Sequence, residues 1–227
     1  MEAGEGRSDH GLARIVVRPV ASPLTLGFLA LAVGTFTVAG AELSWIKASQ
    51  DGFAGLGVLL FVFPLQAIGS IYGFLARDSI AGTGMGLLAG GWLVIGALTF
   101  SDHHGQAVGA LGLILLAVAT TVLVPAAVGA ASKPLASLVM AGTALRFYLT
   151  AAYQLSGSTA WDGAAAAEGL LLAVAAIYAA LAFELEDNRL QTVLPTFRRG
   201  PGRRAMSGTL ADELAGVHRE AGVRKQL

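Results

Sequence analysis

The sequence has 227 residues, of which 55% are apolar and only 13% are charged, and its 15 basic and 15 acidic side chains give a net charge of zero. Its mean hydropathy is +0.66. A soluble globular domain carries about twice this share of charge, so the composition excludes a disordered chain, a nucleic-acid-binding protein and an ordinary soluble enzyme. The lack of cysteine excludes a disulfide scaffold and a cysteine-ligated metal site. The remaining class is a membrane protein that crosses the bilayer several times.

Six apolar runs of about 20 residues follow a polar N-terminal tail of residues 1–22, and each is long enough to span a bilayer. They cover roughly residues 23–43, 55–75, 79–100, 106–129, 134–155 and 163–185. Lipid offers the backbone no hydrogen-bond partner, so each run must be helical. We therefore predict an all-α fold, with a six-helix transmembrane domain over residues 23–185 and a basic C-terminal tail over residues 186–227.

Residues typical of helix ends lie where the runs begin. Pro23 and Pro134 lie in first turns, where the missing N–H of proline does no harm. Asp78 and Ser79 are suited to cap the third helix.

The basic residues predict the orientation. With six spans and both tails in the cytoplasm, Lys47 is the only basic residue in an outer loop. The inner side then holds Arg7, Arg14, Arg18, Arg77, Lys133 and all basic residues after the sixth run. This is the bias of the positive-inside rule, and it predicts a multi-pass protein of the inner (plasma) membrane with both termini in the cytoplasm. An alternative is a signal peptide cleaved after Ala39-Gly40-Ala41, but its polar lead is long and cleavage would leave the new N-terminus outside.

The C-terminal tail carries a cluster of four arginines: Arg198, Arg199, Arg203 and Arg204. Basic clusters beside a membrane attract anionic lipid headgroups, so we expect these arginines to contact lipid. Further on, Leu210, Leu214 and Val217 have helical spacing, which fits either a short surface helix or an unstructured tail.

Glycines recur at helical spacing in two of the runs. Gly82, Gly86 and Gly90 share one face of the third helix, and Gly69 and Gly73 share one face of the second. Small residues at this spacing let neighbouring helices approach closely. Two interpretations stay open for the third helix: close packing, or a wall of backbone beside a narrow path.

Two charged residues lie within the runs away from their ends. Arg146 is near the middle of the fifth run, where an arginine costs about 2.5–3.5 kcal/mol to insert, so it should face protein or water. Glu168 is in the sixth run, which returns in the opposite direction, so the two lie within roughly two turns in depth and can pair. Arg146 either attracts an anion into a path or forms a structural ion pair.

Other polar residues carry weaker signals. Gln66 follows Pro64, which is expected to kink the second helix. Most hydroxyls in the runs, such as that of Thr83, are expected to bond their own helix backbone. Asp102, His103 and His104 indicate an exposed loop rather than a metal site, because adjacent histidines point apart. We find no phosphate loop, catalytic triad or deep carboxylate pair, so the sequence predicts neither an enzyme, a metal nor a cofactor.

Three stretches resemble one known family. Residues 21–28 read Ala-Ser-Pro-Leu-Thr-Leu-Gly-Phe, which resembles a degraded form of the Asn-Pro-Ala-Pro-Leu-Gly-Leu signature of the acetate uptake transporters, the succinate–acetate permeases. Residues 74–79, with the glycine-rich run that ends at Trp92-Leu93, resemble the family's second hairpin. The helix containing Tyr178, then Glu184, Glu186 and the Leu-Pro ending at Pro195, resembles its closing pattern. The resemblance covers residues 20–195 in helix number, length and order.

The resemblance implies a six-helix protomer, assembled as a homo-oligomer and usually a hexamer, with its own narrow path for small mono- or dicarboxylates such as acetate and succinate. Three departures matter. The family's constriction tyrosine falls on Leu88 or Ala89, its helix-one phenylalanine falls on Leu29, and its helix-six glutamate falls on Phe183. The protein therefore carries a different substrate or has lost transport.

We thus predict a transporter or channel for small carboxylates, or alternatively a transport-inactive scaffold or accessory subunit of the same fold. Twelve residues are candidates for the substrate path. They are Pro23, Leu24, Leu26, Phe28, Leu29, Gln66, Thr83, Leu88, Trp92, Arg146, Glu168 and Tyr178. In this hypothesis Arg146 attracts the anion, helix N-termini favour it at the cytoplasmic side, and apolar residues such as Phe28, Leu29 and Leu88 gate the path.

Overall fold

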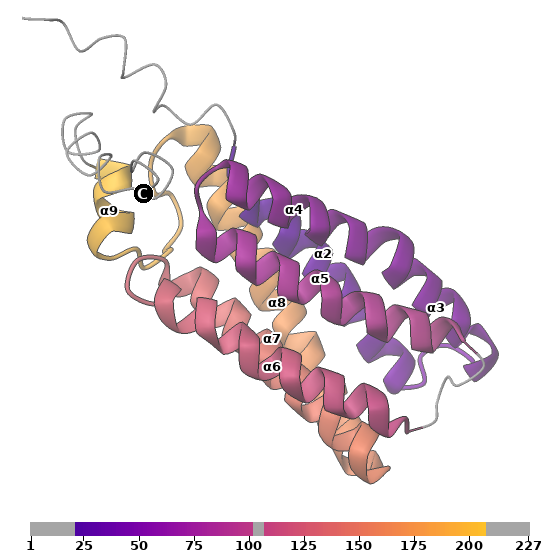
Figure 1. Ribbon diagram of the computed structural model, residues 1–227. Helices are drawn as coiled ribbons and strands as arrows, with labels where there is room; N and C mark the ends of the chain where they lie inside the picture. The colour runs from indigo at the N-terminus through magenta and orange to yellow at the C-terminus, as the bar shows by residue number, and fades with distance from the viewer. Residues whose placement is uncertain (1–20, 102–106, 208–227) are drawn as a thin grey trace, which may run out of the picture.

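The computed structural model describes residues 21–101 and 107–207, and it shows a bundle of long helices (Figure 1). Within these residues, six helical spans are long and apolar enough to cross a membrane. They are α2 (Leu24–Glu42); a run of η1 (Ala48–Gln50), α3 (Asp51–Gly57), η2 (Val58–Val62) and α4 (Phe63–Leu75); α5 (Ser79–Phe100); α6 (Gly109–Gly129); α7 (Pro134–Ser156); and α8 (Thr159–Arg189). The short α9 (Gly200–Ser207) follows. The predicted all-α, six-span fold is confirmed. Two predictions fall outside the described residues: the loop with the two histidines, at residues 102–106, and the surface helix, at residues 208–227.

The second span departs from a regular α-helix just before Pro64. Residues Val58–Val62 form a π-helical turn, η2. Proline has no N–H and its ring crowds the carbonyl four residues earlier, which here is that of Leu60. A widened turn relieves this conflict, so the irregularity expected at Pro64 takes the form of a π-turn.

Two helices begin at the residues that the sequence predicted as helix starts. The Asp78 carboxylate accepts a hydrogen bond from the Ala81 backbone N–H at 3.1 Å and caps α5. Pro134 occupies the first turn of α7, and that helix ends at Gly157, whose φ of 67° is left-handed. The helix α8 extends beyond the predicted run in both directions, over residues 159–162 and 186–189.

The six spans pack as a closed ring. Each span contacts the next along the chain, and α2 also packs against α8, which closes the ring. Glycines bring α4 and α5 together: a Cβ atom on Gly73 would lie 2.5 Å from the Gly82 backbone nitrogen, and one on Gly86 would lie 2.9 Å from the Ser70 Oγ. This face of α5 thus packs against α4, which favours the packing interpretation over a glycine-lined path.

Large buried side chains fill the middle of the ring, and we call this group the inner core: Phe28, Leu88, Trp92, Phe147 and Phe183. Phe28 and Phe183 have ring centroids 6.1 Å apart, and Trp92 meets Phe147 edge to face at 5.7 Å. Most large apolar side chains on the outside of the ring are exposed, as expected for a surface that faces lipid or other copies of the chain.

The bundle has two different ends. A hydrogen bond of 2.9 Å from the Ser22 backbone N–H to Asp187 places the start of α2 beside the end of α8. We call this the tail end; it also carries residues 76–78, 130–133 and 190–207. The opposite end, with residues 43–50 and 156–158, is the loop end. That the tail end faces the cytoplasm stays a prediction.

Candidate functional site: a cavity on the axis of the bundle

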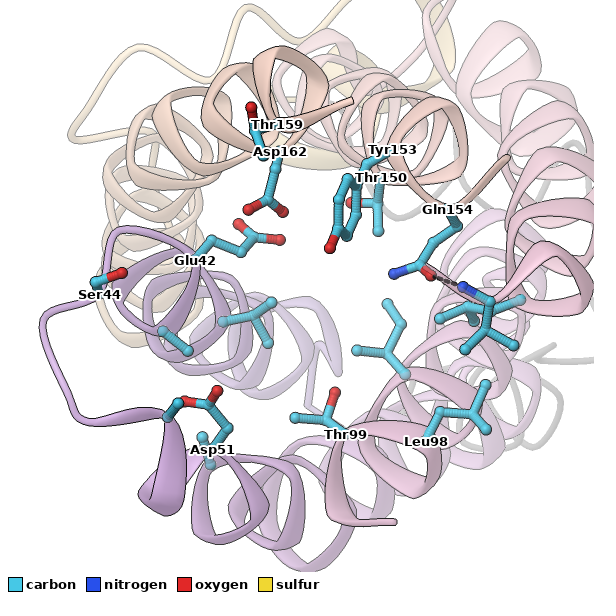
Figure 2. Close-up of a pocket in the computed structure, with 17 residues that line it drawn as sticks. Glu42, Ser44, Asp51, Leu98, Thr99, Thr150, Tyr153, Gln154, Thr159 and Asp162 are labelled. Carbon is cyan, nitrogen blue, oxygen red and sulfur yellow. Dashed lines mark hydrogen bonds between the residues drawn. The ribbon is translucent and has the colours of Figure 1, made fainter. Parts of the chain in front are cut away.

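A cavity of about 380 Å³ lies at the loop end, and all six spans line it (Figure 2). Its lining includes Glu42 from α2, Asp51 from α3, Thr99 from α5, Tyr153 from α7 and Asp162 from α8, and Leu111 represents α6. Because the spans form a closed ring and each contributes, the cavity lies on the axis of the bundle rather than on its side.

The lining of the cavity is acidic. Glu42, Asp51 and Asp162 all contribute carboxylates, and no basic side chain is among the lining residues in the described part of the chain. In Figure 2, Glu42 and Asp162 lie close together with Tyr153 facing them across the opening. Gln154 is held in place, since its Oε1 atom accepts a 2.6 Å hydrogen bond from the Val108 N–H. Gathered carboxylates lower the local concentration of anions and raise that of cations.

Arg146 lies directly behind Glu42 in the bundle interior. Its Nη2 atom donates to both Glu42 oxygens, at 2.8 and 2.7 Å, and the residue is only 2% exposed. The predicted inward-facing position of Arg146 is therefore confirmed, whereas the partner suggested by depth, Glu168, is wrong. Glu42 is the last residue of α2, and a charge at the end of an apolar run is normally expected at the membrane interface, so sequence reasoning had no signal for this pair.

Glu168 lies near the same arginine without bonding to it. It experiences the Arg146 charge, yet its Oε2 atom is buried and has no hydrogen-bond partner. Gly169 beside it accepts a 3.1 Å hydrogen bond from the Thr35 hydroxyl, which ties α8 to α2. A Cβ atom on Gly169 would lie 3.3 Å from Arg146 Nε, so this glycine leaves room for the guanidinium.

The Arg146 guanidinium has unused donor capacity. Glu42 engages one terminal nitrogen only, and the other, Nη1, is buried without a hydrogen-bond partner. A guanidinium carries five N–H donors and commonly binds a carboxylate through two parallel bonds. The pair with Glu42 does not use that arrangement, so a further acceptor can still bind.

Other predicted path residues lie deeper along the axis. Leu88 and Trp92 are fully buried in the inner core, with Phe28. Trp92 is thirteen residues beyond the tail-end start of its helix and Arg146 twelve beyond the start of its own, so both lie at a similar depth of about 19 Å. The Trp92 Nε1 donor is buried without a partner, like Arg146 Nη1. Two unpaired donors therefore lie at one level of the bundle interior.

Toward the tail end, Pro23 and Leu24 are buried where α2 begins. Gln66 is also buried; its Nε2 donates to the Gly27 carbonyl at 3.3 Å, and its Oε1 has no partner. The Tyr178 hydroxyl donates to the Pro195 carbonyl at 3.0 Å, and so fastens the segment after α8 to the bundle.

The structure places three other candidates on the outside of the ring. Leu26 is 37% exposed and Leu29 is 45% exposed, and Thr83 is also exposed. We therefore leave these three residues out of the proposed path.

At the tail end, Glu186 gathers the segment after α8. It is 1% exposed and accepts hydrogen bonds from Thr192, Thr196 and Arg198, the last through both Nε at 2.8 Å and Nη2 at 2.6 Å. Arg198 also lies over the Phe183 ring, 5.5 Å from its centroid. The Arg198 side chain thus bonds within the protein, and lipid contact by the arginine cluster stays a prediction. Arg199 and Arg203 are exposed, and the Arg204 side chain lies outside what the structure describes.

A solved membrane protein shares this architecture. No protein-family model matches the chain, and no curated protein sequence matches it. Among solved structures, a bacterial acetate channel, SatP, superimposes with a TM-score of 0.68 at 20% sequence identity. The match covers 78% of this chain and 99% of that channel. At this identity the likeness establishes the fold, which is that of a multi-pass membrane protein.

Proposed function

We propose that this protein is a membrane channel or transporter for small carboxylates, of the size of acetate or succinate. The observation that carries the proposal is the axial cavity: six spans arranged as in SatP surround it, and its lining residue Glu42 is bonded to the buried Arg146, which has an unpaired donor. An isolated carboxylate costs tens of kcal/mol to move into an apolar medium as an idealised ion. Arg146 is placed to offset that penalty inside the ring.

The acidic lining specifies how such a substrate enters. A carboxylate anion is repelled by Glu42, Asp51 and Asp162, whereas the uncharged acid, or an anion that arrives with a proton, is not. The proposed route therefore carries substrate and proton together from the loop end. The helices α2, α5 and α7 begin at the tail end, so the positive ends of their helix dipoles lie there and favour the anion once it has crossed.

Below the cavity, the inner core provides the gate. Phe28, Leu88, Trp92 and Phe147 are each fully buried, so these side chains close the axis in this conformation. Apolar constrictions of this kind gate by excluding water until side chains move. Transport then requires rotamer changes in the inner core.

Uptake into liposomes tests the proposal. Purified protein is reconstituted, and the initial uptake of labelled formate, acetate, lactate and succinate is compared with that of protein-free liposomes at a pH where passive leakage of the acid is slow. We expect faster uptake for at least one short carboxylate, with saturation. No uptake above the protein-free rate for any member of the panel would overturn the proposal.

A transport-inactive scaffold is the second candidate, and the closed inner core is the observation that favours it. It predicts that replacing Leu88 by alanine opens no flux for any short carboxylate. A gated channel predicts that the same change raises flux or admits longer acids, because it shortens the side chain that closes the axis.

We also propose, from the family resemblance, that the protein forms a homo-oligomer, a hexamer, in the inner membrane with both termini in the cytoplasm. The exposed apolar exterior of the ring supports burial against lipid or against neighbouring copies. The mass of the detergent-solubilised complex tests the assembly, and labelling of residues introduced at the two ends in intact cells tests the orientation.

A further inference from the structure

We propose that the Glu42 carboxylate occupies the carboxylate-binding position of Arg146, as a built-in competitor that an incoming substrate carboxylate must displace. The inference rests on the proposed function only in naming the competing anion. Its basis is the geometry of the pair and of the cavity beside it.

The first step concerns the position of Glu42. It lies on the boundary between two environments: it lines the loop-end cavity, and both of its oxygens contact Arg146 Nη2 in the interior. Its side chain is 13% exposed, against 2% for that of Arg146. A substrate that enters the cavity therefore meets Glu42 before it meets the arginine.

The second step concerns what holds Glu42 in place. It is the last residue of α2, where the helix dipole disfavours a negative charge. Asp162 lines the same cavity, and both Asp162 and Glu168 experience the Arg146 charge, so Glu42 shares one cation with two other carboxylates. Among the described residues, Arg146 is the hydrogen-bond partner that favours the inward position of the Glu42 side chain, and a competing carboxylate can make the same contact.

The third step concerns the free donor. Arg146 Nη1 is buried and unpartnered, and the side chain is more than nine-tenths buried. A carboxylate that bound through two parallel bonds would satisfy this donor as well as the one that Glu42 uses. The substrate thus gains one hydrogen bond that Glu42 does not make. A tethered carboxylate has an effective concentration in the millimolar range or above, so we expect substrate binding to be weak while Glu42 competes.

Thermal unfolding in detergent tests this without any transport measurement. The Tm is measured against sodium acetate, with sodium chloride at equal ionic strength as the reference. In Glu42→Gln the competitor is gone and the arginine is unpaired, so acetate should stabilise the variant at about a tenfold lower concentration than the unaltered protein. Asp162→Asn removes the same charge from the same cavity but breaks no bond to Arg146, and it is the matched control.

Three outcomes decide the matter. A larger acetate response in Glu42→Gln than in Asp162→Asn supports the inference. Equal responses in the two variants overturn it, because then the cavity charge alone governs binding. If Glu42→Gln does not fold, Glu42→Asp carries the same measurement: its shorter side chain reaches Arg146 less well, and a response no larger than that of the unaltered protein overturns the inference.

The flux assay remains separate from this test. Acetate binding that depends on Glu42, without uptake by liposomes, would leave the site intact and overturn the proposed transport. Uptake without such binding would overturn the site and leave transport intact.

Discussion

Each end of the bundle holds one buried arginine–glutamate pair, and the two pairs differ in how completely their atoms are used. At the tail end, Glu186 accepts four hydrogen bonds and Arg198 adds a contact with an aromatic ring. At the loop end, Glu42 contacts one nitrogen of Arg146, the second nitrogen has no partner, and a cavity lies alongside. The hydrogen-bonding atoms of the Glu186 carboxylate are fully used in the first pair, whereas one donor nitrogen of Arg146 stays unused in the second.

This is the difference that we expect between a structural pair and the proposed binding site. A fully bonded buried carboxylate fixes the chain around it, and here it fastens residues 190–198 to the end of α8. An unpaired buried donor costs free energy comparable to a lost hydrogen bond, about 1–3 kcal/mol, unless something binds it. The unpaired Arg146 donor therefore supports the proposal that a carboxylate binds there.

The largest effect is expected from removing the loop-end pair. Arg146→Gln should lower acetate uptake by about tenfold or more, because the cation that offsets desolvation is lost. It should also destabilise the fold by about 3–5 kcal/mol, since Glu42 is left unpaired.

The double variant Arg146→Gln/Glu42→Gln sharpens this result. It removes both charges, so we expect its Tm to recover while uptake stays low. Recovery of uptake together with stability would show that the pair is structural, like that at the tail end. Liposome uptake and thermal unfolding on the same preparations provide both readings.

The two pairs should also respond differently to substrate. Glu186→Gln weakens a charge-assisted network, and we expect a loss of about 1–3 kcal/mol in stability. Added acetate should not restore that loss, whereas it should raise the Tm of Glu42→Gln. Parallel melting curves with and without acetate check this, and equal rescue of both variants would contradict the distinction between the two ends.

Most of the fold could be predicted from the sequence, but less of the site could, and the reason is physical. Runs of apolar residues fix the number of spans, and Pro134 and Asp78 fix where two of them begin. In a lipid-facing bundle every face of a helix is apolar, so no periodicity tells the ring interior from its exterior. Leu29 and Phe28 are neighbours of similar character, yet one is exposed and the other is buried.

How well the position of a charged residue could be predicted depended on its depth in the membrane. Arg146 lies mid-span, where its insertion penalty requires a protein-facing position, and that prediction is confirmed. Glu42 lies where a span ends, and such a charge normally faces water. Depth alone brought Arg146 level with Glu168, but the rotation of each helix about its axis decides which carboxylate bonds, and sequence spacing does not encode that rotation.

A smaller effect is expected at Asp162. Asp162→Asn removes one carboxylate from the cavity and leaves the Arg146 pair intact, so an arriving anion meets less repulsion. We expect acetate uptake to rise by about two- to threefold near neutral pH, through a faster entry rate. Initial rates over a range of acetate concentrations measure this. A decrease in rate would indicate that Asp162 itself takes part in binding.

The smallest effect is expected from salt, and its sign separates the two ends of the bundle. Raising the ionic strength shortens the Debye length from about 10 Å at 0.1 M to about 3 Å at 1 M, which screens the acidic mouth. Acetate uptake from the loop end should therefore increase modestly with an inert salt, whereas a basic mouth would give a decrease. In Asp162→Asn the salt dependence should be weaker, because one of the three screened carboxylates is gone. Uptake that falls with salt in both proteins would mean that the acidic cavity is not the entrance, and that substrate enters past the exposed Arg199 and Arg203 at the tail end.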